Sequence, residues 1–98
     1  MVTSSLLEAE KRLLGLISQS KKLYKMSSAQ IKADEFATDV YRRLAKSMYD
    51  SYENGMSPDP AMMLNDFSND DLSEASEVFY NLEVYSGDEE TVKELLYT

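Results

Sequence analysis

Residues 38–55, TDVYRRLAKSMYDSYENG, decide the fold of this 98-residue chain. Apolar side chains recur there every three or four positions, so one half of a helix built from this stretch would be apolar. That half holds Val40, Tyr41, Leu44, Ala45, Met48, Tyr49 and Tyr52, and the other holds Arg42, Arg43, Lys46, Asp50 and Glu53. Thr38 suits the N-cap and Gly55 suits a left-handed C-cap. The stretch therefore predicts a helix from Thr38 or Asp39 to Asn54.

Helical patterns also occupy the segments on either side of this helix. They cover residues 5–18, 21–29, 60–67, 70–84 and the stretch from 89 to the end. The expected core face of the pattern at 70–84 is Leu72, Ala75, Val78, Phe79 and Leu82. Ser5 and Glu8 have the spacing of a capping box, and Asp59 followed by Pro60 is typical of a helix start. No segment alternates β-branched or aromatic residues with polar ones, so no strand is expected. We predict an all-α fold, a compact bundle of five to six short helices around a central helix at about residues 39–54.

The chain is short enough to form one domain over residues 1–98, because it can bury only one modest core. Its last helical pattern reaches Thr98 without a glycine, a basic last turn or a proline. We therefore expect an excised fragment whose native chain continues past residue 98. No apolar run approaches the roughly 18 residues of a membrane span. No cleavage-like site follows the first helix, so a cytoplasmic protein without a membrane partner is expected.

Composition excludes several classes of function. The chain has no histidine and no cysteine, which removes imidazole bases, thiol nucleophiles, disulfides and the common zinc sites. Its net charge of -8 argues against direct nucleic-acid binding, because affinity for phosphates comes from lysine and arginine. Residues 1–49 carry nine basic and five acidic groups, whereas residues 50–98 carry one and thirteen. The acidic half is either an ordinary solvated surface, the commoner case, or a surface that steers a basic partner.

The remaining polar residues do not combine into a reaction centre. Asp70 and Asp71 could be a metal-binding pair, but acidic residues after Asn69 are expected in the first turn of a helix for capping and dipole reasons. The three glycines are isolated, so no phosphate-binding loop is present. We therefore expect no catalytic residue, no metal and no cofactor, and a fragment that is not an enzyme.

Glu10 is the most informative polar residue, because it falls in the middle of the apolar face of the first helix. A carboxylate in such a position must be paired or carry a substantial desolvation cost. Arg42 and Arg43 of the central helix are the nearest plausible partners. We predict a structural ion pair between Glu10 and Arg42; a catalytic acid in a pocket is the alternative, weakened by the lack of a second convergent group.

Contact residues for a partner protein are harder to identify. Met56, Met62 and Met63 could form an adaptable binding surface, although methionine more often fills a core. Exposed tyrosines often anchor interfaces. The resulting candidates for partner binding are Tyr80 and Tyr85, joined by Tyr97.

Three stretches in order resemble a known family: EAEKRLLGLI at 8–17, ADEFATDVYRRLAKSMYDSYENG at 33–55 and NDDLSEASEVFYNLEVY at 69–85. Together they resemble the C-terminal helicase-binding domain of the bacterial DnaG-type DNA primase. The first two are also similar to the N-terminal domain of the replicative helicase, a structural relative of that domain. Phe36 matches the aromatic residue that precedes the central helix in the family, and Arg42 matches the arginine six positions later.

The resemblance implies a role in DNA replication. It implies a protein-binding module of the primosome that docks primase onto the hexameric replicative DNA helicase, with the zinc-binding and polymerase domains of primase absent here. A terminal helical hairpin supplies much of that contact in the family, so Val92, Leu95, Leu96 and Tyr97 become candidates for the path to the interface. The fragment is expected to be monomeric. The alternatives are the N-terminal collar domain of the helicase itself, or an acidic helical regulator with an unknown partner.

Overall fold

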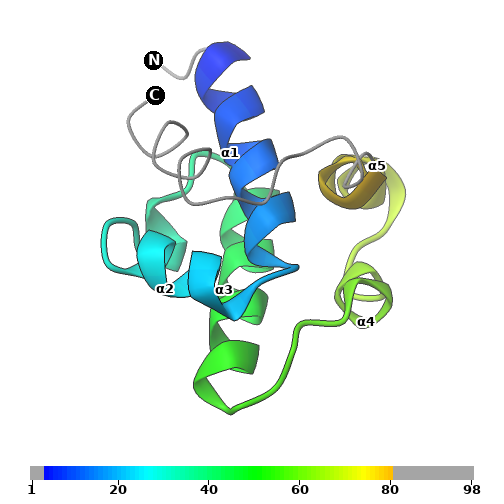
Figure 1. Cartoon of the computed structure of the whole chain (residues 1–98). Coiled ribbons are helices and arrows are strands. Elements are labelled where there is room, and N and C mark those ends of the chain that lie inside the picture. The colour runs from blue at the N-terminus through cyan, green and yellow to red at the C-terminus, as the bar shows by residue number, and fades with distance from the viewer. Residues whose placement is uncertain (1–3, 81–98) are drawn as a thin grey trace.

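The structure, a computed structural model, describes residues 4–80 and is all-helical within them (Figure 1). The elements are α1 (Ser4–Ile17), α2 (Lys21–Ser28), the 3-10 helix η1 (Ala33–Glu35), α3 (Asp39–Glu53), α4 (Pro60–Leu64) and α5 (Asn69–Tyr80). The predicted all-α class and the central helix are confirmed. The helix expected from residue 89 onward lies outside the described residues.

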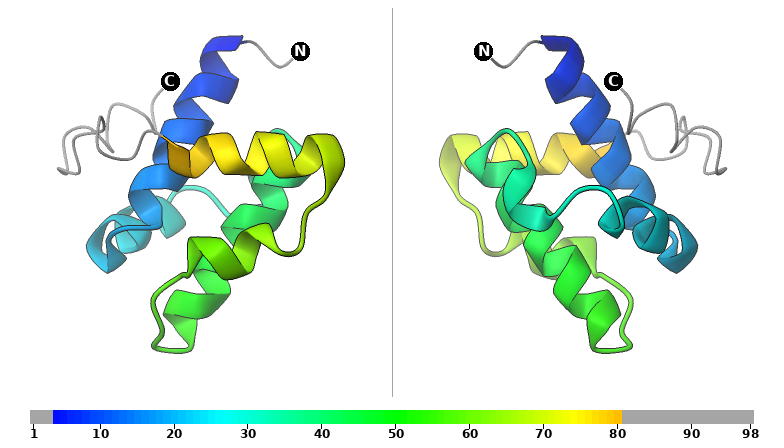
Figure 2. Two further views of the ribbon diagram at one scale, coloured as in Figure 1. Left: turned by 90° about the vertical axis from the view of Figure 1, so that its right-hand side faces the viewer. Right: turned by 90° about the vertical axis from the view of Figure 1, so that its left-hand side faces the viewer.

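Helices α1 and α3 form the middle layer of the molecule. In Figure 1, α2 lies on one side of this pair and the shorter α4 with α5 lies on the other. Figure 2 shows α5 crossing both α1 and α3, with α4 beneath it. The buried side chains of α1 and α3 therefore meet in the centre, while the opposite side of α3 remains available to solvent and to the segment that follows it.

Helix α3 begins and ends where its sequence predicts. The N–H of Tyr41 donates to the Thr38 hydroxyl over 3.0 Å, which makes Thr38 the N-cap. Gly55 follows the helix with a φ of 74°, a conformation that glycine adopts without steric cost. All seven apolar residues of the predicted face are buried. The periodicity and the end signals agree, which is why this helix was predictable.

An aromatic cluster joins α2 to α3. The Tyr24 ring stacks on Tyr52, with centroids 4.8 Å apart, and meets Tyr49 edge to face at 5.1 Å. The Tyr52 hydroxyl donates to the carbonyl of Ile17 over 2.6 Å, and the Tyr49 hydroxyl donates to the carbonyl of Ile31 over 3.0 Å. These bonds satisfy carbonyls at the end of α1 and after α2, so the same side chains fill the core and fasten two chain reversals.

Three predicted details differ from the structure. Helix α1 already includes Ser4 and Ser5, so Ser5 is not the N-cap that its spacing to Glu8 suggested. Helix α4 ends at Leu64 rather than at residue 67. Leu72, expected in the core face of α5, is 37% exposed, because Ala75 and Val78 take the buried side and turn Leu72 to the rim.

Candidate protein-docking site

The structure tests none of the residues predicted to contact a partner. Tyr80 is the last residue of α5. The other five predicted contact residues, Tyr85, Val92, Leu95, Leu96 and Tyr97, lie outside the described residues. The candidate site that the structure offers is therefore built from other side chains, on α3, α4 and the connection to α5.

The three methionines near residue 60 divide between the two predicted roles. Met63 is 4% exposed and belongs to the core, whereas Met56 and Met62 are 61% and 69% exposed. Met62 and Met63 are neighbours on α4, so this short helix holds onto the bundle by one side chain and presents the next to solvent. The two exposed methionines, Met56 and Met62, are available for contact with another molecule.

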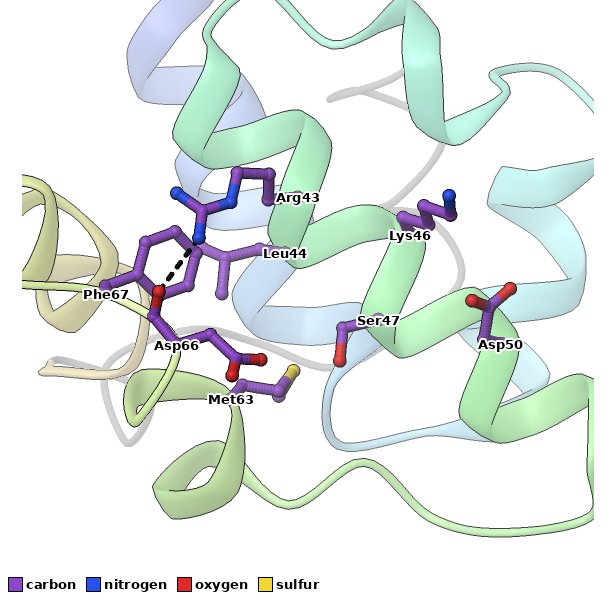
Figure 3. A pocket seen from close by; sticks show the side chains of 8 residues that line it. All are labelled: Arg43, Leu44, Lys46, Ser47, Asp50, Met63, Asp66 and Phe67. Carbon is purple, nitrogen blue, oxygen red and sulfur yellow. Dashed lines mark hydrogen bonds between the residues drawn. The ribbon is translucent and has the colours of Figure 1, made fainter.

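A groove separates the exposed side of α3 from α4 and the following connection (Figure 3). It encloses about 430 Å³ and has a partly apolar lining. The apolar part is Leu44, Met63 and Phe67, and the polar part is Arg43, Lys46, Ser47, Asp50 and Asp66. In Figure 3 the side chains of Ser47 and Met63 point toward one another across the groove. Apolar floors with a few placed polar groups are typical of binding sites.

Arg43 is held in one orientation at the end of the groove. Its Nη2 donates to the carbonyl of Asp66 over 2.8 Å, and its guanidinium lies 4.3 Å from the centre of the Phe67 ring. Its Nη1 is 4.0 Å from an oxygen of Asp39. Three contacts on three sides reduce the rotamer freedom of a long side chain, so less conformational entropy remains to be lost when a ligand binds.

A second hollow lies on the other side of Arg43 and Lys46. It encloses about 390 Å³ and is lined by Ala33 and Asp34 of η1 with Arg42, Arg43 and Lys46 of α3. Arg43 and Lys46 thus form the wall that both hollows share. Lys46 is exposed, and among residues 4–80 it has no ion-pair partner within 4.0 Å. The wall between the hollows is therefore positively charged.

Glu10 is buried, as its place on the apolar face of α1 predicted, with 6% of its surface exposed. The expectation of a direct ion pair with Arg42 needs correction. Glu10 Oε1 accepts a 2.8 Å hydrogen bond from the N–H of Ala37, while Arg42 Nη1 donates to the carbonyls of Phe36 and Ala37 over 3.0 and 3.3 Å. Both side chains bind the backbone of the segment before α3, because that segment runs between them.

The pKa of Glu10 is raised above its usual value. Burial of the carboxyl is the largest cause, and it is opposed by the hydrogen bond from Ala37 and by the positive charge of Arg42. A buried acid with a raised pKa can serve as a general acid, but that role needs a second group and room for substrate. Here the hydrogen bonds of Glu10 and Arg42 end on backbone groups, so the arrangement is structural.

No cluster of metal-ligand side chains is found in the described part of the chain. Residues 4–80 hold no group of three or more histidine, cysteine, aspartate or glutamate side chains that could bind a metal ion. Asp70 and Asp71 lie exposed in the first turn of α5, where acidic residues favour the helix N-terminus. Over the same residues, none of the helices has the length and apolar character needed to cross a membrane.

Sequence reasoning missed the residues of the groove. Arg43 was considered only as a member of the polar face of the central helix and as a possible partner of Glu10, and Lys46 only as a member of that face. Their spacing of three positions places them on one side of a helix, which was a usable signal. Phe67 and Asp66 gave no signal of this kind, because their position beside Arg43 depends on how the segment after α4 folds back.

Comparison with known proteins assigns the chain to a family. The family model described as the DnaB-like helicase N terminal domain matches residues 2–95. The chain belongs to this family. No curated protein and no solved structure is significantly similar to it.

As a DnaB-like helicase N-terminal domain, the chain is a helicase-associated helical domain of a non-catalytic kind. This agrees with the predicted link to DNA replication and with the predicted kinship to the replicative helicase. The matched family is the one to which the first two of the three quoted stretches were also similar.

Proposed function

We propose that this domain docks a DNA primase onto the N-terminal collar of the hexameric replicative helicase and has no catalytic role of its own. The observation that carries the proposal is membership, over residues 2–95, of a helicase-associated family. The third stretch, at 69–85, supports the primase side of that family, because it resembles the primase domain and forms α5 over its described part. With this role the domain would act in DNA replication, in the cytoplasm.

The surface of the domain supports a binding role. The hydrogen bonds of Glu10, Arg42, Tyr49 and Tyr52 end on the protein's own backbone, so the buried polar groups serve the fold. The groove beside α3 is open and has a partly apolar floor. An exposed methionine and a held arginine, residues enriched in protein interfaces, lie on the elements around it.

The second candidate is the collar domain of the helicase itself. It is favoured by the description of the matching family, which names the helicase and not the primase. A collar domain would bind copies of itself, whereas a primase domain would bind the helicase and remain monomeric alone. The two functions therefore differ in what the isolated chain does in solution.

Size-exclusion chromatography with light scattering separates the two candidates. The chain is measured alone, and then after mixing with a replicative helicase from the same source. For a primase domain we expect a monomer alone and co-elution with the helicase. Self-association without co-elution supports the collar domain, and a monomer that does not bind the helicase contradicts both.

A further inference from the structure

We infer that the groove between α3 and α4, together with the hollow beside η1, binds an acidic segment of a partner protein. In this arrangement an aspartate or glutamate of the partner sits on the wall formed by Arg43 and Lys46, and apolar side chains on either side of it enter the two hollows. The inference rests on the proposed function only in taking the ligand to be a protein, and it adds the surface and the chemistry of the segment.

The positive charge of the wall contrasts with the acidic second half of the described chain. Within the described residues, positions 50–80 carry eight acidic groups and no basic one. Arg43 and Lys46 nevertheless project from the exposed side of α3 next to this acidic half, and Arg42 lines the second hollow. An acidic ligand is therefore attracted to this wall and repelled by the surface beyond it, which confines it to one place.

Arg43 is ready to bind a carboxylate. Its contacts with Asp66 and Phe67 fix the guanidinium without enclosing it, since the residue remains exposed. Its ion pair with Asp39 is long, at 4.0 Å, and lies at the surface, so a closer carboxylate of a ligand can compete with it. Lys46, three positions later, is exposed and has no ion pair within residues 4–80. One held cation and one adjustable cation on the same side of a helix form a site for a single carboxylate.

The linings of the two hollows favour apolar groups on either side of that carboxylate. The first has Leu44, Met63 and Phe67 in its lining, and the second includes the methyl group of Ala33 and the stems of the two arginines. Both are open to solvent on the surface of the domain, as Figure 3 shows for the first. Apolar residues on both sides of an acidic one would fill them and exclude water from the ion pair, which strengthens it.

A nucleic acid fits this site less well than a peptide. Its phosphates carry charge at every step, and the groove has carboxylates at its edges, with Asp50 and Asp66 in the first hollow and Asp34 in the second. Those carboxylates repel a continuous negative backbone. A peptide can place one acidic side chain between them and neutral groups elsewhere.

The three exposed lysines of α2 provide an internal comparison. Lys21, Lys22 and Lys25 carry more positive charge than the wall, but the hollow that Lys21 lines encloses only about 160 Å³, against about 430 and 390 Å³ for the two hollows beside the wall. Charge alone would therefore send an acidic peptide to α2. Charge combined with apolar hollows sends it to α3, and a residue-specific measurement can tell these apart.

A nuclear magnetic resonance titration of the full isotope-labelled chain tests the inference. The probe is a synthetic peptide in which two leucines flank a pair of glutamates, and a second peptide carries serines in place of the leucines. We expect saturable shifts of the amide signals of Arg43, Ser47 and Met63. The serine peptide should bind at least about fivefold more weakly, because the hollows remain unfilled.

Charge reversal supplies the matched variants. Lys46→Glu should weaken binding of the leucine peptide by about tenfold, whereas Lys25→Glu makes the same charge change on α2 and should leave it unchanged. Equal shifts at α2 and α3, equal loss in both variants, or no saturable shift at the groove would overturn the inference. So would a short single-stranded oligonucleotide that moves the groove signals at lower concentration than the peptide. None of these outcomes depends on binding to a helicase, so the proposed function stands or fails separately.

Discussion

Removing the carboxylate of Glu10 tests how the middle of the bundle is held. Glu10→Ala leaves the N–H of Ala37 without its 2.8 Å acceptor and truncates a buried residue, of whose surface only 6% is exposed. An unpaired backbone donor costs about 1–3 kcal/mol. We expect Glu10→Ala to lower the free energy of unfolding by about 2–3 kcal/mol once the lost packing of its methylenes is included.

Glu10→Gln should cost less than half as much. Glutamine keeps an oxygen that can accept from Ala37, and it removes a charge whose burial raises the pKa. The loss of the charge-assisted part of the bond, about 1 kcal/mol, is offset in part by the desolvation that is no longer needed. The assay is urea unfolding followed by circular dichroism, with the free energy taken from linear extrapolation.

The stability difference between wild type and Glu10→Gln should change with pH in a defined direction. The pKa of Glu10 is raised in the folded state, so the folded protein holds this proton more tightly than the unfolded chain does. The contribution of Glu10 to stability therefore falls as the pH rises from its pKa in the unfolded chain through its pKa in the folded protein. The wild-type advantage over Glu10→Gln should therefore be larger at about pH 4 than at about pH 7.

Glu8→Gln is the matched control on the same helix. Glu8 pairs with Lys11 at 3.0 Å and with Arg12 at 3.5 Å, and its pKa is lowered mainly by the hydrogen bond to Lys11. The wild-type advantage over this variant should grow with rising pH and stay near 0.5 kcal/mol or less, roughly what an exposed pair contributes. The reasoning is refuted if Glu10→Gln is as damaging as Glu10→Ala, or if both glutamine variants show the same pH trend.

Three further substitutions test the core, each by urea unfolding. Tyr52→Phe removes the donor to the Ile17 carbonyl and should cost about 1–2 kcal/mol; an unchanged stability would mean that this bond contributes nothing. Ser27→Ala removes a buried hydroxyl that has no hydrogen-bond partner among residues 4–80, so stability should stay equal or rise by about 1 kcal/mol, and a clear loss would reveal a partner. Tyr41→Phe should be as stable as wild type at pH 7 and more stable than wild type at about pH 11. Burial and the charges of nearby glutamates raise the pKa of Tyr41 to about 12, so wild-type stability falls as the pH rises above 10. Parallel stability curves against pH for the two proteins would contradict this.

The central helix could be predicted because its determinants are local. The spacing of its apolar residues, the Thr38 cap and Gly55 all lie within one stretch, and each points to the same helix. Leu72 was misplaced because the rotation of α5 about its axis is set by packing against α1 and α3, which no local pattern records.

The candidate site was only partly predictable. Burial of Glu10 followed from helical periodicity, and its neighbourhood to Arg42 was expected. The direct ion pair was not found because Phe36 and Ala37 pass between the two side chains and offer backbone groups to both. The groove forms because the segment after α4 folds back and places the Phe67 ring against the guanidinium of Arg43. This is a tertiary contact between two segments that share no sequence pattern, so it was not predictable.

Hydrogen–deuterium exchange of the chain, alone and with a saturating amount of the replicative helicase, tests the central claim most directly. We expect the helicase to slow exchange at backbone amides of this domain, including the segment from Met63 to Phe67 beside the groove, while α2 exchanges as before. Exchange that is the same with and without the helicase would contradict a docking role for this domain.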